Sequence, residues 1–181
     1  MQRLYLAPGV ALAALLLVSG CGSAPGDTTA TAAPKGTEVA GADLPRPPAI
    51  PDEATDAQAA PLNDAGEIAS EISANTAIEE VPVNGGLAWR EDGQVVRTAS
   101  NDGQRIAYFR AGERQPFFVQ RGGLAYAYQN GRAELAYDSQ GRPVPVPAAA
   151  RADAQQLAEQ SGRERALAER APPEGRPANE S

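Results

Sequence analysis

Several residue types that support catalysis or stabilise small secreted domains are scarce or missing in this chain. It contains no histidine, one cysteine (Cys21) and one lysine (Lys35) in 181 residues. Without histidine, Ser-His-Asp and Cys-His catalysis is excluded, and so are zinc sites that need His ligands. One cysteine cannot form an intramolecular disulfide. We therefore expect no enzyme, no catalytic residue, no metal site and no bound cofactor.

A hydrophobic run long enough to cross a membrane is also missing. The apolar stretch from Val10 to Val18 follows the positive charge of Arg3 and ends in small residues. A transmembrane helix needs about 20 apolar residues, so this stretch is too short to span a bilayer. A basic residue, a short apolar run and small residues are the three parts of a secretory signal. Residues 1–20 are therefore predicted to be a signal peptide.

The lone cysteine follows this apolar run directly, in the order Val18-Ser19-Gly20-Cys21. The motif resembles the lipobox of bacterial lipoprotein precursors. The resemblance covers roughly the first 23 residues, and it implies cleavage before Cys21 and a diacylglycerol on its thiol. Two or more acyl chains hold a protein firmly on a membrane, where one chain does so only marginally. Because Gly22 and Ser23 follow instead of aspartate, the resemblance implies attachment to the outer membrane. Whether the protein faces the periplasm or the cell exterior stays open.

The segment from Cys21 to residue 61 is predicted to be the acylated cysteine and a disordered tether. Residues 22–61 contain only three large apolar side chains, Val39, Leu44 and Ile50. Such a segment cannot bury enough surface to offset its ordering entropy. Seven prolines further discourage helix and sheet. A flexible tether of ~40 residues has a root-mean-square reach of about 35 Å.

Residues 62–147 are predicted to form a small antiparallel β-meander, so the fold class is mainly β. Glycines 93, 103, 112, 122, 131 and 141 follow one another at intervals of nine or ten residues. Asp-Gly and Asn-Gly pairs favour tight hairpins because both residues tolerate positive φ. Seven runs of strand formers lie between these turns: 87–90, 95–99, 105–110, 115–120, 124–128, 134–138 and 143–146.

The middle runs are apolar on both faces, so the sheet needs two covers. Alternation places Ile106 and Tyr108 opposite Phe109, and it places Phe117 and Val119 opposite Phe118. One cover is predicted to come from curling of the sheet into a roll or partial barrel. The other is a short helix over residues 65–74, capped by Asp64 and Glu67 and bearing Ile68 and Ile72, or a partner molecule.

Residues 148–181 are predicted to form a solvated polar helix followed by a disordered tail. The helix lacks a long apolar stripe, since Leu157 and Leu167 do not share a face and Gly162 interrupts it. The net charge of −7 and the absence of a basic cluster make nucleic acid a poor partner.

One group of side chains is a candidate ligand site. Tyr126 and Tyr128 lie two residues apart on one strand, flanked by Arg121 and Arg132. An aromatic strip beside arginines suits a sugar or a peptide, whereas core packing explains the same tyrosines. The favoured function is a non-enzymatic adaptor or structural lipoprotein that binds an envelope protein or a glycan. The alternative is a glycan or small-ligand sensor that uses this strip.

A second resemblance concerns the segment from Gly131 to Arg142. Gly131-Arg132, Tyr137-Asp138 and Gly141-Arg142 resemble one unit of the YD repeat of Rhs-type surface proteins. That resemblance implies a carbohydrate-handling or encapsulating β-surface. The same residues are favoured by hairpin turns in general, and both explanations stay open.

Overall fold

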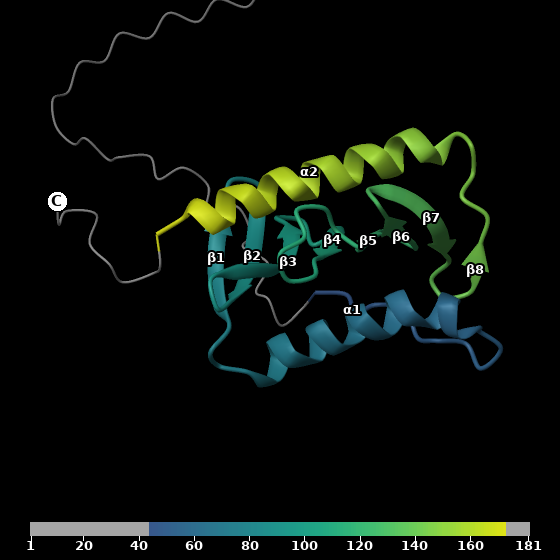
Figure 1. Cartoon of the computed structure of the whole chain (residues 1–181), viewed down its shortest axis with the longest axis horizontal. Coiled ribbons are helices and arrows are strands. Elements are labelled where there is room, and N and C mark those ends of the chain that lie inside the picture. The colour runs from purple at the N-terminus through teal and green to yellow at the C-terminus, as the bar shows by residue number, and fades with distance from the viewer. Residues whose placement is uncertain (1–43, 173–181) are drawn as a thin grey trace, which may run out of the picture. The chain divides into compact units, whose positions relative to one another are not determined.

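The computed structural model describes residues 44–172, which form an antiparallel sheet with one helix before it and one after it (Figure 1). The predicted signal peptide, Cys21, residues 22–43 of the predicted tether and residues 173–181 lie outside the described residues. The strands pair in chain order from first to last, so the predicted meander is confirmed. They are β1 (Glu79–Val83), β2 (Gly86–Glu91), β3 (Gln94–Ser100), β4 (Arg105–Tyr108), β5 (Phe118–Arg121), β6 (Leu124–Gln129), β7 (Arg132–Tyr137) and β8 (Pro143–Val144).

The hairpins follow from the turn residues. Asp92 and Gly93 have φ of 49° and 81°, and Asn130 and Gly131 have φ of 52° and 75°. Two successive positive φ values are what a two-residue type I′ turn requires. The regular spacing of these turns therefore defines the strand order without any contribution from distant residues.

The sheet has one strand more than predicted and does not close. The sequence analysis missed β1, because it contains Pro82 and two glutamates, which are poor strand formers. Proline has no backbone N–H, and it is tolerated in an edge strand because one side of that strand has no neighbouring strand to donate to. Within residues 44–172, β1 pairs only with β2 and β8 only with β7, so the sheet is open rather than rolled.

The helix before the sheet, α1 (Asp56–Ala74), is longer than predicted. Its N-terminal capping box is formed by Thr55 and Gln58, not by Asp64 and Glu67. Pro61 lies inside the helix, although the sequence analysis took the prolines of this region as evidence against helix. The lost backbone hydrogen bond is offset by burial of the helix face that includes Leu62.

Residues 44–61 therefore belong to the folded body and not to a tether. The segment before α1 lies against the sheet, where the side-chain amide of Gln120 donates to the Arg46 carbonyl oxygen at 3.2 Å. Leu44 packs against the core on this side. The predicted boundary at residue 61 was wrong because the apolar and hydrogen-bond contacts of this segment offset the effect of its prolines.

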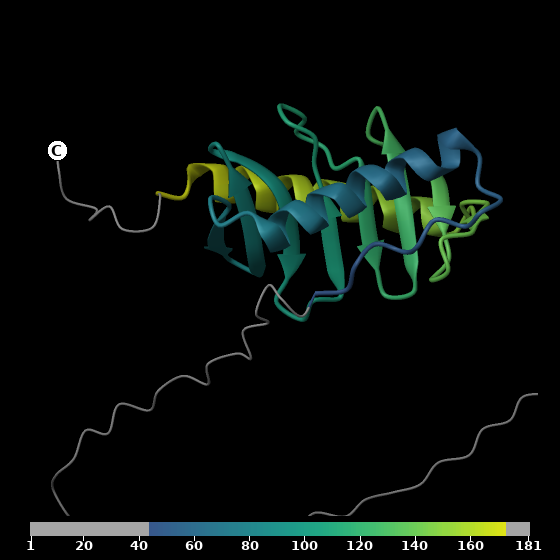
Figure 2. The same cartoon turned by 90° about the horizontal axis from the view of Figure 1, so that it is seen from below.

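α1 runs across one face of the sheet (Figure 2). That face holds most of the large aromatic side chains. The Trp89 indole N–H donates to Glu80 at 3.0 Å, and the Tyr137 hydroxyl donates to the Gln58 carbonyl oxygen of α1 at 2.9 Å. Both hydrogen bonds satisfy polar atoms of side chains that are otherwise buried. The cluster on this face comprises Leu62, Ala65, Ala69, Trp89, Ala99, Ile106, Tyr108, Phe117, Phe118, Ala125, Ala127 and Tyr137.

Phe117 departs from the predicted alternation. It belongs to the same cluster as Phe118, although strand alternation placed the two rings on opposite faces. The reason is that β5 begins only at Phe118, so the residue before it does not follow the pleat. Val119 lies on the opposite face as predicted.

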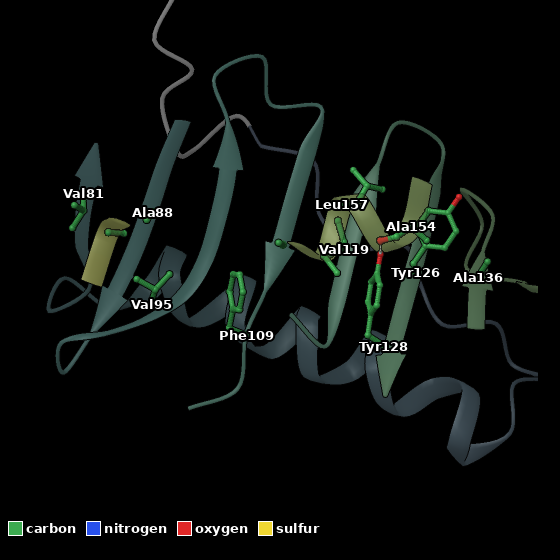
Figure 3. Packing of buried hydrophobic residues seen from close by; sticks show 13 residues of the cluster. Val81, Ala88, Val95, Phe109, Val119, Tyr126, Tyr128, Ala136, Ala154 and Leu157 are labelled. Atoms are coloured by element: carbon green, nitrogen blue, oxygen red, sulfur yellow. Dashed lines mark hydrogen bonds between the residues drawn. The ribbon is translucent and has the colours of Figure 1, made fainter. Parts of the chain in front are cut away.

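The second cover is α2 (Ala150–Arg170), which the sequence analysis took for a solvated helix. It lies on the opposite face of the sheet from α1, and Figure 3 shows residues of the cluster that it forms there. The helix buries small and polar side chains at helical spacing: Ala154, Leu157, Ala158, Ser161, Glu164, Arg165 and Ala168. The predicted helix is confirmed, but the expectation that it is solvated was wrong. Its buried stripe contains one large apolar residue, and its small residues let the helix approach the sheet closely.

Burial of the tyrosines makes the fold sensitive to alkali. Desolvation raises the pKa of Tyr108 and of Tyr137 to about 12. An unfolded tyrosine ionises near pH ~10, so between pH 10 and 12 the folded state binds more protons than the unfolded state. The free energy of unfolding is therefore expected to fall across this range and to be unaffected below it. Tyrosine absorbance at 295 nm should rise together with loss of near-ultraviolet circular dichroism, and ionisation near pH 10 without unfolding would contradict this.

Candidate functional site

The structure does not keep the four residues of the predicted ligand strip together. Tyr128 is 7% exposed beneath α2, and its hydroxyl donates to the Ala154 carbonyl oxygen at 2.7 Å (Figure 3). Arg121 pairs with Leu124 at the first residue of β6, and Arg132 pairs with Gln129 at its last residue. The two exposed arginines therefore lie at opposite ends of β6. A continuous exposed strip of two tyrosines and two arginines therefore does not exist, because α2 covers the ring faces.

Two of the four predicted residues, Arg121 and Tyr126, line the same cavity of about 450 Å³, where hairpin turns approach α2. We call it the hairpin-end cavity. The turn between β3 and β4, the turn between β5 and β6 and the first half of α2 contribute its walls. Its lining residues are Asp102, Gln104, Arg121, Gly122, Leu124, Tyr126, Asp153 and Leu157.

The inner part of this cavity is apolar. Tyr126 and Leu157 are each 5% exposed and belong to the core cluster between the sheet and α2. Leu124, the first residue of β6, is 41% exposed. The cavity therefore offers an apolar contact surface that reaches from the core to the outside.

The outer part carries charge of both signs. Asp102 and Asp153 bring two carboxylates, and Arg121 brings one guanidinium. Asp102 is held in place by two donors: the Ser100 hydroxyl and the backbone N–H of Gln104, the latter at 3.0 Å. The hydrogen bond from Ser100 lowers the pKa of the Asp102 carboxyl. At neutral pH it is therefore a charged acceptor already oriented before any ligand arrives.

An apolar interior with a few fixed polar groups is the usual make-up of a ligand or peptide site. The two carboxylates accept hydrogen bonds from hydroxyl or ammonium groups, and the arginine donates to carboxylates or carbonyl oxygens. Across residues 44–172, no cluster of three side chains suited to metal binding is found. No helix in that part of the chain has the length and hydropathy to span a bilayer.

The sequence analysis missed Asp102, Asp153 and Leu157 as site residues. It assigned Asp102 to a hairpin turn, which is correct for its backbone, and it placed the other two on a solvated helix. Spacing of the small residues Ala154, Ala158 and Ser161 at three and four positions was the signal for the buried side of α2. That signal would have placed Leu157 inward and Asp153 beside it.

No protein-family model matches this chain, and no curated protein or solved structure matches it either.

Proposed function

We propose that this protein is a lipid-anchored component of the bacterial cell envelope that binds another envelope component through the hairpin-end cavity. The observation that carries the anchor is the motif Val18-Ser19-Gly20-Cys21 directly after a short apolar run. Acylation of Cys21 would attach the chain to the membrane, with the outer membrane favoured by Gly22 and Ser23. The proposed role is binding rather than catalysis.

The arrangement of the module supports binding at the hairpin ends instead of at a sheet face or edge. Both faces of the sheet are covered by helices of the same chain. At one edge Pro82 interrupts the row of backbone donors of β1, and at the other β8 is two residues long and begins with Pro143. Proline and short edge strands discourage pairing with a strand from another molecule.

The chemistry of the cavity favours a segment of a neighbouring envelope protein as the partner. Leu124 and the floor formed by Tyr126 offer apolar contact, and Arg121 and the two aspartates add a charged rim. An apolar centre with a polar rim is the usual composition of a protein–protein contact. A glycan is the second candidate, because Asp102 and Asp153 can accept hydrogen bonds from sugar hydroxyls.

Lipid attachment is tested by growing cells with radiolabelled palmitate and comparing the native chain with Cys21→Ser. We expect label on the native protein, none on the variant, and loss of the variant from the membrane pellet. Thr28→Ser, downstream of Cys21 and outside the motif, is the control for general effects of substitution in this region and should keep both label and membrane association. An unlabelled native protein would refute the anchor.

Partner binding is tested by placing a photoreactive amino acid at Leu124 in intact cells. We expect one adduct of defined mass, which Arg121→Glu should reduce. The control places the same photoreactive group at Glu134, which is exposed on β7 and does not line the cavity. Equal adducts at both positions would contradict a specific contact, and an adduct with a polysaccharide would favour the second candidate.

A further inference from the structure

A second cavity, of about 300 Å³, lies between the loop after β4 and the C-terminal half of α2. We call it the arginine cavity. Its lining residues are Arg114, Gly162, Arg165, Ala166, Glu169 and Arg170, and it shares none of them with the hairpin-end cavity. Three arginines against one glutamate give its walls a formal charge of +2 (3 − 1).

Arg165 is the buried member of this group. It is 4% exposed, and its Nε donates to Glu169 at 2.7 Å while its guanidinium lies over the Phe109 ring at 5.2 Å. Its Nη1 is buried and has no hydrogen-bond partner among the described residues. A buried guanidinium nitrogen without an acceptor is costly, and the donors that a ligand in this cavity can reach are those of the exposed Arg114 and Arg170.

Gly162 allows the loop after β4 to lie close to α2. A Cβ atom built on Gly162 would lie 3.2 Å from the Arg114 carbonyl oxygen, which is closer than side chains normally approach. A glycine in a helix interior costs about 1 kcal/mol relative to alanine. The missing side chain lets the backbone of the loop pass close to α2 and brings Arg114 to the same cavity as Arg170.

The C-terminal end of a helix normally repels anions, because its free carbonyl groups carry partial negative charge. Here Arg90 of β2 offsets that effect. Its Nη1 donates to the carbonyl oxygens of Ala168 and Ala171, at 3.3 and 3.0 Å. The last carbonyl groups of α2 therefore have a donor, but Glu79 forms an ion pair with the same guanidinium at 2.7 Å, so the positive charge of the arginine cavity comes from its own lining arginines.

We propose that the arginine cavity binds a phosphate group. Arginine forks suit the oxygens of phosphate, which can accept two parallel hydrogen bonds from one guanidinium. The formal charge of +2 matches a phosphate monoester, which carries about −1.5 to −2 at neutral pH. The phosphate has two possible sources, a soluble phosphate ester or the headgroup of a phospholipid. The site depends on neither the lipid anchor nor the hairpin-end cavity.

The test titrates the full chain, kept in neutral non-ionic detergent micelles, with three ligands in a calorimeter. The ligands are inorganic phosphate, glycerol 3-phosphate and dioctanoyl phosphatidic acid. We expect saturable binding that Arg114→Gln and Arg170→Gln each weaken about tenfold, as expected for loss of one charge-assisted hydrogen bond. Both side chains are exposed, so the fold should survive, and circular dichroism checks this.

Arg163→Gln is the matched control, because Arg163 is exposed on the same helix but does not line the cavity. It should change the affinity less than about twofold. Tighter binding of the phospholipid than of glycerol 3-phosphate identifies a membrane source, and equal binding identifies a soluble one. The proposal fails if none of the ligands binds by about 10 mM, or if Arg163→Gln weakens binding as much as the other two variants.

Discussion

Replacing Glu164 with alanine is expected to lower the free energy of unfolding by about 3–5 kcal/mol, because it leaves a buried guanidinium without its partner. Glu164 of α2 forms an ion pair with Arg105 of β4, and the two side chains are 9% and 11% exposed. The pair lies where α2 crosses the sheet, so its loss weakens the contact between helix and sheet. Urea unfolding of the variant and the native protein measures the difference.

Two further variants separate this effect from others. Glu159→Ala removes a carboxylate that is exposed on the same helix, and it should change stability by less than about 0.5 kcal/mol. The double variant Arg105→Met/Glu164→Leu removes both charges and should recover most of the loss. A cost below about 1 kcal/mol for Glu164→Ala would show that water reaches this pair.

Replacing Gly86 with alanine is expected to cost about 3 kcal/mol or more, at the upper end of the range for overpacking. Gly86 is the buried first residue of β2, and a Cβ atom there would lie 1.8 Å from the Ala99 carbonyl oxygen of β3. Since the obstacle is backbone, no change of side-chain rotamer relieves it. The β2–β3 hairpin must open at this end, and the amide of Asn101, which donates to the Gly85 carbonyl oxygen at 3.0 Å, should lose protection from hydrogen exchange.

Gly123→Ala provides the control for this variant. Gly123 lies in the turn between β5 and β6, and nothing lies within 4 Å of a Cβ atom built on it. Its φ is outside the positive range, so alanine fits without strain. Stability should stay within about 0.5 kcal/mol of the native value. If both glycine variants lose stability equally, the effect comes from glycine flexibility in general and not from the close approach of β2 to β3.

The strand order could be predicted because it depends on local interactions. Each Asp-Gly or Asn-Gly pair sets a hairpin by its own φ preferences, and the strand formers between the turns then have only their neighbours to pair with. The need for two covers also followed from the sequence, since Tyr108 and Phe109 point to opposite faces of one strand end. The helix bearing Ile68 and Ile72 does cover one face of the sheet, but it is longer than predicted.

The candidate site could be predicted only in part, because it depends on which side chains α2 covers. The sequence predicted both Tyr128 and Arg121 as exposed residues of the ligand strip. In the structure Tyr128 lies under α2, whereas Arg121 is exposed. Neither cavity is formed by residues that are close in the chain. Arg114 and Arg170 are 56 positions apart (170 − 114), and no sequence pattern links them.

By itself, the sequence determined the hairpin order, the mainly β class and the expectation of a lipid anchor at Cys21, because each rests on neighbouring residues. Only the tertiary structure decided that α2 packs on the sheet. The helix buries alanines, Ser161 and the charged Glu164, whose contribution depends on Arg105 in a distant strand. Propensity and periodicity describe a residue and its neighbours along the chain, whereas the free energy of that contact depends on groups brought together by folding.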